Sequence, residues 1–221
     1  MCKKFSPLLN NLDFLEFYGR MLGDGWLSVY VCYDKGKRRE KWIIGFSGHL
    51  EKDRVLMEDT IKKSKNLFDR NGHLKEKLKY NALELWIGHR ELVKFINQEL
   101  GFPIGKKVNL KISEKINKKP RFLIPIIRGI FDTDGSFFLD KNFGRIYPQI
   151  EIHMNAILLL DQLELFLKSR GFRLTRRPQR IRLKGIKQIT KWMNEIGSSN
   201  PKHILRYLDW LKKCGPVAQL G

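Results

Sequence analysis

One nine-residue pattern occurs twice in this chain and constrains any fold that the chain adopts. The first copy, residues 17–25, reads FYGRMLGDG, and the second, residues 127–135, reads IRGIFDTDG. Each copy is an apolar run with a small residue at its third and seventh positions and Asp-Gly at its end. Because half of the chain separates the two copies, they indicate a duplicated module rather than a short-period repeat.

Both copies are expected to form the last turns of a helix. Asp13, with Glu16 three residues later, is a helix-start signal, and Gly25 is a residue that ends helices in the left-handed conformation. Gly135 is expected to end the second helix in the same way. Pro125, which a helix tolerates best in its first turn, predicts that the second helix begins near Ile124.

The small residues of the two copies predict that these helices pack against each other. Residues four apart lie on the same helix face, and glycine within a helix costs up to ~1 kcal/mol relative to alanine. Missing side-chain bulk allows two backbones to approach closely, which gives those glycines a reason to be there. We therefore expect a helix interface at Gly19, Gly23, Gly129 and Thr133.

The acid at the end of each copy points to a cation. A carboxylate at a helix C-terminus faces the negative end of the helix dipole, yet the chain places Asp24 and Asp134 there. If the helices pack as expected, the two acids become neighbours, and like charges share a site only with a proton or a cation between them. A hard divalent cation with oxygen ligands, most simply Mg²⁺, fits this arrangement.

The two copies resemble the paired signature motifs of the single-chain LAGLIDADG homing endonucleases. The first copy departs from the family pattern at Arg20 and at Leu22, which replaces an acid, but neither position carries the chemistry in the family. The resemblance implies an α+β fold of two pseudo-symmetric αββαββα modules that form a saddle of two antiparallel sheets. It also implies intron homing: Mg²⁺-dependent hydrolysis that leaves a staggered double-strand break in a long, pseudo-palindromic DNA target. Ca²⁺ is expected to support binding without cleavage.

The resemblance also suggests roles for residues near the two acids. Asp24 and Asp134, with Gly23 and Thr133 beside them, are the expected metal-binding residues. Lys106 and Lys202 become equivalent when Gly101 is laid on Gly197, and they are candidates to act at the scissile phosphates, with Lys107 close behind.

Composition independently favours a polyanionic partner. Lys and Arg number 43 against 23 Asp and Glu, giving a net charge of +20, and no apolar run is long enough to span a membrane. The cysteines, Cys2, Cys32 and Cys214, lack metal-ligand spacing. We expect an intracellular monomer that binds double-stranded DNA without a membrane or a protein partner, in a prokaryotic cytoplasm rather than an organelle.

The order of elements repeats in the two halves. Residues 1–105 and 121–221 are expected to form the modules, with a lysine-rich linker at residues 106–120. In the first module, strands are expected at residues 26–32, 42–47, 75–79 and 83–87, with a basic loop at residues 35–39. In the second, residues 136–140 and 147–154 are expected to be strands, followed by a hairpin at residues 172–184 around Pro178.

One face of each sheet is expected to read the major groove, because a β-ribbon fits that groove and Arg, Gln and Glu can pair with base edges. Lysines are expected to contact phosphates. The residues assigned to this DNA face are Trp26, Ser28, Tyr30, Lys35, Lys37, Arg38, Arg39, Ser47, Lys75, Lys77, Lys79, Glu84, Trp86, Ser136, Phe138, Gln149, Glu151, His153, Arg176, Arg177, Arg180, Arg182 and Lys184.

Two other functions use the same scaffold. An RNA maturase would assist the splicing of its own intron, and a DNA-binding regulator would bind without cutting. Neither requires both Asp24 and Asp134, so the intact pair favours the nuclease. His203, Tyr207 and Trp210, near the end of the chain, are expected to be packing residues rather than ligands.

Overall fold

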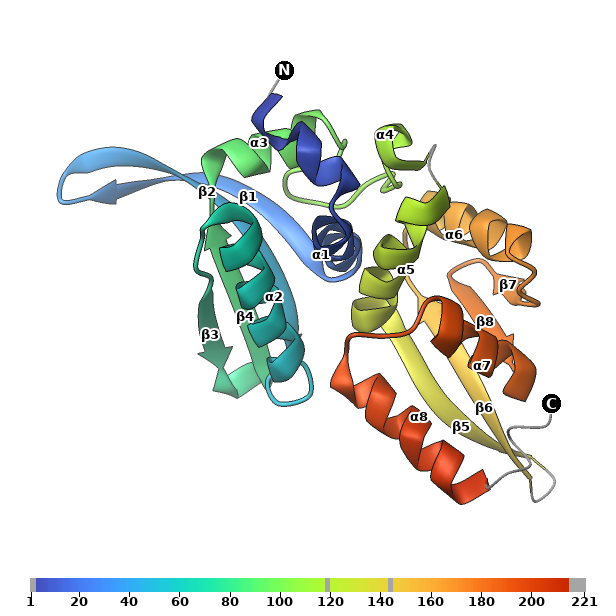
Figure 1. Ribbon diagram of the computed structural model, residues 1–221. Coiled ribbons are helices and arrows are strands. Elements are labelled where there is room, and N and C mark those ends of the chain that lie inside the picture. Colours follow the sequence, from blue (N-terminus) through green and yellow to red (C-terminus); the bar gives the residue numbers. More distant parts are fainter. Residues whose placement is uncertain (1–2, 118–119, 143–144, 215–221) are drawn as a thin grey trace.

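A computed structural model describes residues 3–117, 120–142 and 145–214, which fold into two similar halves (Figure 1). The first half contains η1 (Lys3–Asn10), α1 (Leu12–Gly23), β1 (Gly25–Asp34), β2 (Lys37–His49), α2 (Arg54–Phe68), β3 (His73–Lys77), η2 (Leu78–Tyr80), β4 (Ala82–Gly88) and α3 (Arg90–Gln98). The second contains α4 (Glu114–Asn117), α5 (Pro120–Asp134), β5 (Gly135–Asn142), β6 (Arg145–His153), α6 (Ile157–Ser169), β7 (Thr175–Arg177), β8 (Arg180–Lys184), α7 (Ile186–Glu195) and α8 (Pro201–Cys214).

Each half contains a four-stranded antiparallel sheet. The strand orders are β1-β2-β4-β3 and β5-β6-β8-β7, so that the two sheets have the same topology. Their registers also correspond, because Gly25 pairs with Phe46 at the start of β1 and Gly135 pairs with Ile152 at the start of β5. The predicted α+β fold of two pseudo-symmetric modules, with their sheets forming a saddle, is confirmed.

Helices α1 and α5 pack side by side between the two sheets (Figure 1). A Cβ atom added to Gly19 would lie 2.2 Å from the carbonyl oxygen of Ile126, and one added to Gly129 would lie 2.3 Å from that of Glu16. A Cβ atom on Gly23 would lie 1.9 Å from the hydroxyl oxygen of Thr133. Backbone therefore contacts backbone at the predicted positions, and no larger residue fits without a shift.

The helix ends differ from the predicted ones. Asn11, rather than Asp13, caps α1, because its side-chain oxygen accepts a hydrogen bond from the Phe14 N–H at 3.1 Å. Gly25 and Gly135 are not left-handed and instead begin strands. Their lack of a side chain is required by close packing, since a Cβ atom on Gly25 would lie 2.4 Å from Met21 Cα.

Helix α5 begins earlier than its internal proline predicted. It starts at Pro120, and Pro125 lies within it. Pro120 thus occupies the first-turn position that suits proline, while Phe122 and Leu123 bury their side chains in the turn before Pro125. This apolar burial offsets the hydrogen bond that Pro125 cannot donate.

The first hairpin projects beyond the rest of the molecule as an arm (Figure 1). Lys35 and Gly36 form a two-residue turn in which both φ angles are positive, 48° and 75°, as tight hairpin turns require. The predicted basic loop at residues 35–39 is therefore wrong: β2 already begins at Lys37. Because β4 pairs with β2 only from Ile43 onward, the arm has two strands alone, and Val31 is exposed there.

The segment between the modules packs into the core as well as connecting them. Leu110, Ile112 and Ile116 are buried, and the Gln162 side chain bonds both the N–H and the carbonyl of Ile112. Lys118 and Lys119 lie outside the described residues. Among the helices that the structure does describe, none combines the length and apolarity needed to cross a bilayer.

Candidate active site and nucleic-acid interface

The two motif acids meet at the ends of the paired helices. Asp24 follows the last residue of α1 as its C-cap, and Asp134 is the last residue of α5. Close packing at Gly23 brings the helix ends together, so that the two carboxyl groups lie within hydrogen-bonding distance of each other. One carboxyl group from each half of the chain therefore contributes to a single site.

Burial and mutual repulsion disfavour a double negative charge at this site. The pKa of Asp134 is raised to about 7, mainly by burial and secondly by the neighbouring charge of Asp24. Burial also raises the pKa of Asp24, while Lys107 and Lys202 oppose the rise at both acids. The site therefore suits an added cation, which would relieve the repulsion that a proton otherwise relieves.

Lys107 and Lys202 are the lysines beside the acids. The Lys107 ammonium donates hydrogen bonds to the backbone carbonyls of Leu22 and Gly23, and burial lowers its pKa. Lys202, the second residue of α8, donates to Asp53 at 2.8 Å. Lys106, chosen first from the alignment of the halves, has an exposed side chain, and the lysines whose charges lower the pKa of both acids are Lys107 and Lys202. Lys107, the next residue, has the half-buried side chain that lies beside the acids, and the catalytic role of either lysine stays a prediction.

The donor set fits a hard divalent cation with incomplete protein ligation. Asp24 and Asp134 offer carboxylate oxygens, the donors that such cations prefer. The Gly23 carbonyl is already bonded to Lys107, and the Thr133 hydroxyl donates back to the carbonyls of Gly129 and Ile130. Within the described ranges, no group of three or more His, Cys, Asp and Glu gathers as a metal site. Water and phosphate oxygens would have to supply the remaining ligands.

Asp132 fixes the segment that presents Lys202, a role that no sequence pattern indicated. Its buried carboxylate accepts hydrogen bonds from the Ser198 hydroxyl and from the backbone N–H groups of Ser199 and Asn200. The Asn200 side chain donates in return to the Asp132 carbonyl at 2.8 Å. The start of α8 is thereby tied to the end of α5, two residues before Asp134.

Arg20, where the first motif departs from the family pattern, is buried with its charge paired. Its guanidinium lies 2.6 Å from Glu16 and 2.7 Å from Asp59, and it donates to the Thr60 hydroxyl at 2.8 Å. A side chain with 1% exposure requires such partners, because an unpaired buried charge is costly. The helical spacing of apolar residues predicts an apolar side chain at this position. Arginine is accepted there because its long side chain lets the guanidinium reach Glu16 and Asp59.

The exposed face of the first sheet carries aromatic and basic residues. Trp26 lies over Gly45, where a Cβ atom would stand 2.1 Å from the indole ring, and it contacts the edge of Trp86. The Lys75 ammonium lies 5.7 Å from the Trp86 ring centroid. Tyr30 and Ser47 are exposed on the same face, and Glu84 pairs with Lys77 there. The predicted composition of this face is present along β1, β2, β4 and β3.

The second sheet presents the predicted basic stripe. Arg180, Arg182 and Lys184 alternate with the buried residues Ile181 and Leu183. Glu151, on the neighbouring strand β6, accepts a hydrogen bond from Arg182 and forms an ion pair with Arg180. Ser136 and His153 are exposed on this face, Phe138 is half-buried beneath Arg182, and Arg177 continues the basic surface onto β7.

Arg176, assigned to the DNA face from the sequence, lies on the opposite face of the sheet. It pairs in register with buried Ile181, and its guanidinium contacts Asp161 at 2.8 Å and Glu164 at 3.4 Å on α6. Side chains alternate between the faces of a strand, so Arg176 and Arg177 cannot share one. Because Arg176 and Arg177 are adjacent and identical, the sequence does not show which of them lies on which face.

Three further assignments change with the observed register. Lys79 lies in the η2 turn rather than on a strand. Arg38 pairs with Tyr33, which places it on the opposite face of the arm from Lys37 and Arg39. Gln149 has the predicted register but is 2% exposed, because its amide donates to Asp140 at 2.7 Å.

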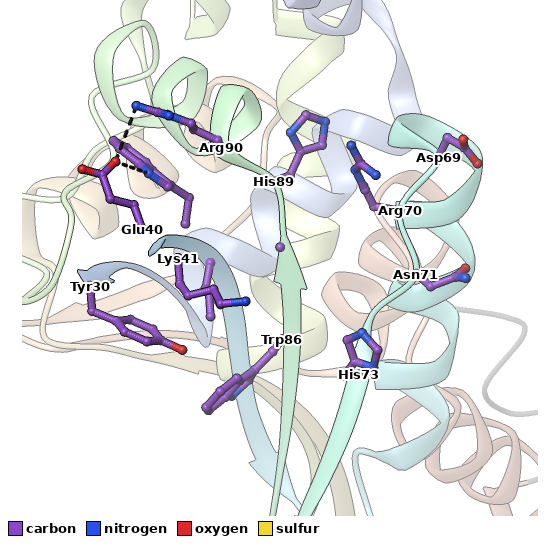
Figure 2. Close-up of a pocket in the computed structure, with 13 residues that line it drawn as sticks. Tyr30, Glu40, Lys41, Asp69, Arg70, Asn71, His73, Trp86, His89 and Arg90 are labelled. Carbon is purple, nitrogen blue, oxygen red and sulfur yellow. Dashed lines mark hydrogen bonds and ion pairs between the residues drawn. The ribbon is translucent and has the colours of Figure 1, made fainter. Parts of the chain in front are cut away.

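A pocket of about 750 Å³ lies at the outer end of the first sheet, on the face that carries Trp26 and Trp86 (Figure 2). Tyr30, Lys41 and Trp86 line it from the strands, while Arg70 and Arg90 line it from outside the sheet. Arg90 stacks over Trp42 and pairs with Glu40. Sequence patterns indicated none of the three basic residues: Arg70 lies in a connection, Arg90 is the first residue of α3, and Lys41 precedes the strand expected at residues 42–47.

His203 packs in the core of the second half, as do Tyr207 and Trp210, which confirms the packing prediction. Its ring centroid lies 4.4 Å from that of Phe131, and its Nδ1 lies 3.3 Å from the Ser198 hydroxyl. Burial lowers the pKa of His203 to about 3, with the charge of Lys202 as the second cause.

This shift predicts a loss of stability in mild acid. The folded state holds His203 neutral down to about pH 3, whereas the unfolded chain protonates it near pH 6.5. Its contribution is therefore complete above pH 6.5 and falls as the pH is lowered towards 3. Urea denaturation at pH 7.5 and pH 5 should show that the wild type loses roughly 2 kcal/mol more than His203→Gln. Equal losses would place the His203 pKa near its ordinary value.

The fold is that of known DNA-cutting proteins. No family model matches the sequence, and no curated protein does. Among solved structures, the I-LtrWI LAGLIDADG homing endonuclease bound to target DNA has 14% identity and a TM-score of 0.54, over 89% of this chain and 88% of that one. Meganuclease I-SmaMI bound to uncleaveable DNA has 15% identity and a TM-score of 0.57, over 90% and 87%.

I-DmoI in complex with DNA and Mn has 19% identity and a TM-score of 0.54, over 86% of this chain and 99% of that one. These matches span both halves, so the likeness extends to the pairing of the two modules. The chain has the two-module fold of the single-chain LAGLIDADG homing endonucleases.

Proposed function

We propose that the protein is a site-specific DNA endonuclease that binds double-stranded DNA as a monomer and cuts both strands with a divalent cation, Mg²⁺ in the cell. The observation that carries this proposal is the meeting of Asp24 and Asp134 at the ends of the paired helices. A maturase or a non-cutting regulator would have no use for two buried acids held in contact. The structures of I-DmoI with DNA and either Mn or Ca support the use of a divalent cation.

DNA would lie along the two exposed sheet faces. Arg182 and Arg180 would meet base edges in the major groove, where arginine can pair with guanine through two hydrogen bonds. The lysines and arginines of the arm, with the general charge of +20, would hold the phosphates. Because the two faces differ in sequence, the target would be only approximately palindromic.

Asp24 and Asp134 would hold the cation between the two sheets. When bound, Mg²⁺ would activate water for attack and stabilise the leaving oxygen of the phosphodiester. Lys107 and Lys202 would offset the charge that develops on the phosphate and orient water near it. Hydrogen bonds from the Lys107 ammonium to the carbonyls of Leu22 and Gly23 hold it close to the acids. A staggered cut would result if this acid pair acted on phosphodiesters of both strands, one on each side of the minor groove.

Selection from a random duplex library tests this proposal without a known target. Sequences retained by the protein in Ca²⁺ would be cloned into a plasmid and incubated with the protein in Mg²⁺. We expect enrichment of one long sequence and conversion of its plasmid to linear DNA. Binding without any cutting would favour the regulator, and failure to enrich DNA, together with activity in an intron-splicing assay, would favour the maturase.

Arg182 and Arg176, which lie on opposite faces of the second sheet, make a matched test of the DNA interface. Arg182→Ala should weaken binding to the selected DNA by roughly 10-fold to 100-fold, since one base contact contributes about 1–3 kcal/mol. Arg176→Ala removes the same charge from the helix-facing side and should leave affinity within about threefold, the effect of its long-range charge alone. Fluorescence anisotropy in Ca²⁺ measures both. Equal losses would mean that only net charge matters.

A further inference from the structure

Asp53 uses its carboxylate in an unusual way. It is the N-cap residue of α2, where aspartate normally accepts a hydrogen bond from an N–H of the first turn, but its side chain makes no such bond. Instead, Oδ2 accepts from the backbone N–H of His49 at 2.9 Å, and Oδ1 accepts from Nζ of Lys202 at 2.8 Å. The carboxylate is therefore directed away from its own helix and towards the second module.

The bond between Asp53 and Lys202 crosses the boundary between the modules beside the carboxyl pair. Both side chains are largely buried, at 16% and 26% exposure. Lys202 acts electrostatically on Asp24 and on Asp134, and Asp53 acts on Asp24. A contact at this place can set where the lysine charge lies relative to both acids.

The local packing leaves room for this arrangement. A Cβ atom on Gly48 would stand 3.0 Å from Cβ of Asp53 and 3.1 Å from its Oδ2. A larger residue at position 48 would therefore crowd the carboxylate out of its place. The hydrogen bond from the Asp53 N–H to the His49 carbonyl, at 3.2 Å, closes the turn that orients it.

The second module lacks the corresponding carboxylate. Ala156 is the N-cap residue of α6 and occupies the position that Asp53 has before α2. Lys107 is held instead by the carbonyls of Leu22 and Gly23. The two lysines beside the acids are thus held by different means, one by backbone and the other by a side chain.

We propose that Asp53 is a positioning residue whose carboxylate holds the ammonium of Lys202 across the module boundary, at the point where it serves the scissile phosphodiester. The inference rests on the proposed function for the role of Lys202. Neutralisation by Lys202 also explains how a third carboxylate is tolerated beside an acid pair in a protein that binds a polyanion.

The first test reads the bridge without any cutting. The free protein is acylated with limiting N-hydroxysuccinimide acetate, and modification of each lysine is quantified by mass spectrometry. Asp53→Asn should raise the acylation of Lys202 several-fold, because the amine loses its partner and becomes more accessible. Glu76→Gln, which removes the carboxylate paired with Arg54 at the start of the same helix, is the matched control and should leave Lys202 unchanged. Equal acylation of Lys202 in all three proteins would overturn the proposal.

The second test reads the role in cleavage. In single turnovers on the selected DNA, Asp53→Asn should slow cutting by roughly 10-fold to 100-fold, as expected for a displaced catalytic group, with affinity in Ca²⁺ within threefold of the wild type. Asp53→Glu, which keeps the charge, should recover part of the rate. In a Lys202→Met background the Asp53→Asn change should have little further effect.

An undiminished effect of Asp53→Asn in the Lys202→Met background would show that Asp53 does not act through Lys202. If the wild type cuts no DNA while Lys202 still becomes reactive in Asp53→Asn, the proposed function fails and the bridge stands. If the wild type cuts DNA and the acylation pattern does not change, the bridge fails alone.

Discussion

Asp24→Asn and Asp134→Asn should each abolish double-strand cutting, with a loss of at least ~10³-fold in rate, while binding in Ca²⁺ persists. The amide keeps the size of the side chain but removes the charge that would hold the cation, so the chemical step loses its principal electrostatic support. Single-turnover cleavage of the selected plasmid in Mg²⁺ measures the rate, and anisotropy in Ca²⁺ measures the affinity.

Asp13→Asn is the matched control, because Asp13 lies at the other end of α1 with an exposed side chain. It should cut at the wild-type rate within about twofold, as expected for a surface substitution. If either motif variant cut normally, the two acids would be structural and the nuclease assignment would fail. Loss of binding together with cutting would instead show that the acids hold the helix pair in place.

Gly129→Ala should be among the most destabilising single substitutions in the chain, at about 3 kcal/mol or more. Its Cβ atom would lie 2.3 Å from the Glu16 carbonyl oxygen and 2.7 Å from the Arg20 backbone nitrogen. Both are backbone atoms that cannot rotate away, so the helices must separate or the backbone must distort. Urea denaturation monitored by circular dichroism gives the change in free energy of unfolding.

Gly88→Ala provides the comparison, since a Cβ atom there meets nothing within 4 Å and its φ angle is not positive. It should change stability by less than about 0.5 kcal/mol. If Gly129→Ala were equally mild, the α1–α5 interface would be more yielding than its geometry indicates.

The duplicated motif made the fold and the core of the site predictable. Glycine spacing predicts which helix faces meet, and the acids that follow those glycines must then meet as well. The position of Lys202 followed from aligning the halves, but the same alignment chose Lys106, whereas Lys107 is the lysine that lies beside the acids. A shift of one residue in a loop leaves no mark on a repeat pattern.

Other parts of the site depended on tertiary contacts that no local pattern encodes. The roles of Asp53 and Asp132 arise from partners about 150 and 66 residues away. Asp53 stands in no distinctive local pattern, and Asp132 lies within the second motif copy, which does not indicate the partners of its side chain. Arg176 shows the converse, since three consecutive strand residues were too few to reveal which face each occupies. Arg70 lies in a connection and Arg90 begins α3, and at both places the direction of the side chain follows from the fold alone.

The backbone contacts between α1 and α5 bear on the length of the proposed DNA target. Because backbone meets backbone at Gly19 and Gly129, these contacts fix the distance between the two helices and hence the placement of the two sheets. Inserting one base pair at the middle of the target would move one half-site by about 3.4 Å and turn it by about 35° around the duplex axis. An interface of flexible side chains could adjust to such a change, whereas the backbone contacts at Gly19 and Gly129 resist it. The protein should therefore discriminate against a changed spacing between half-sites as strictly as against a changed sequence.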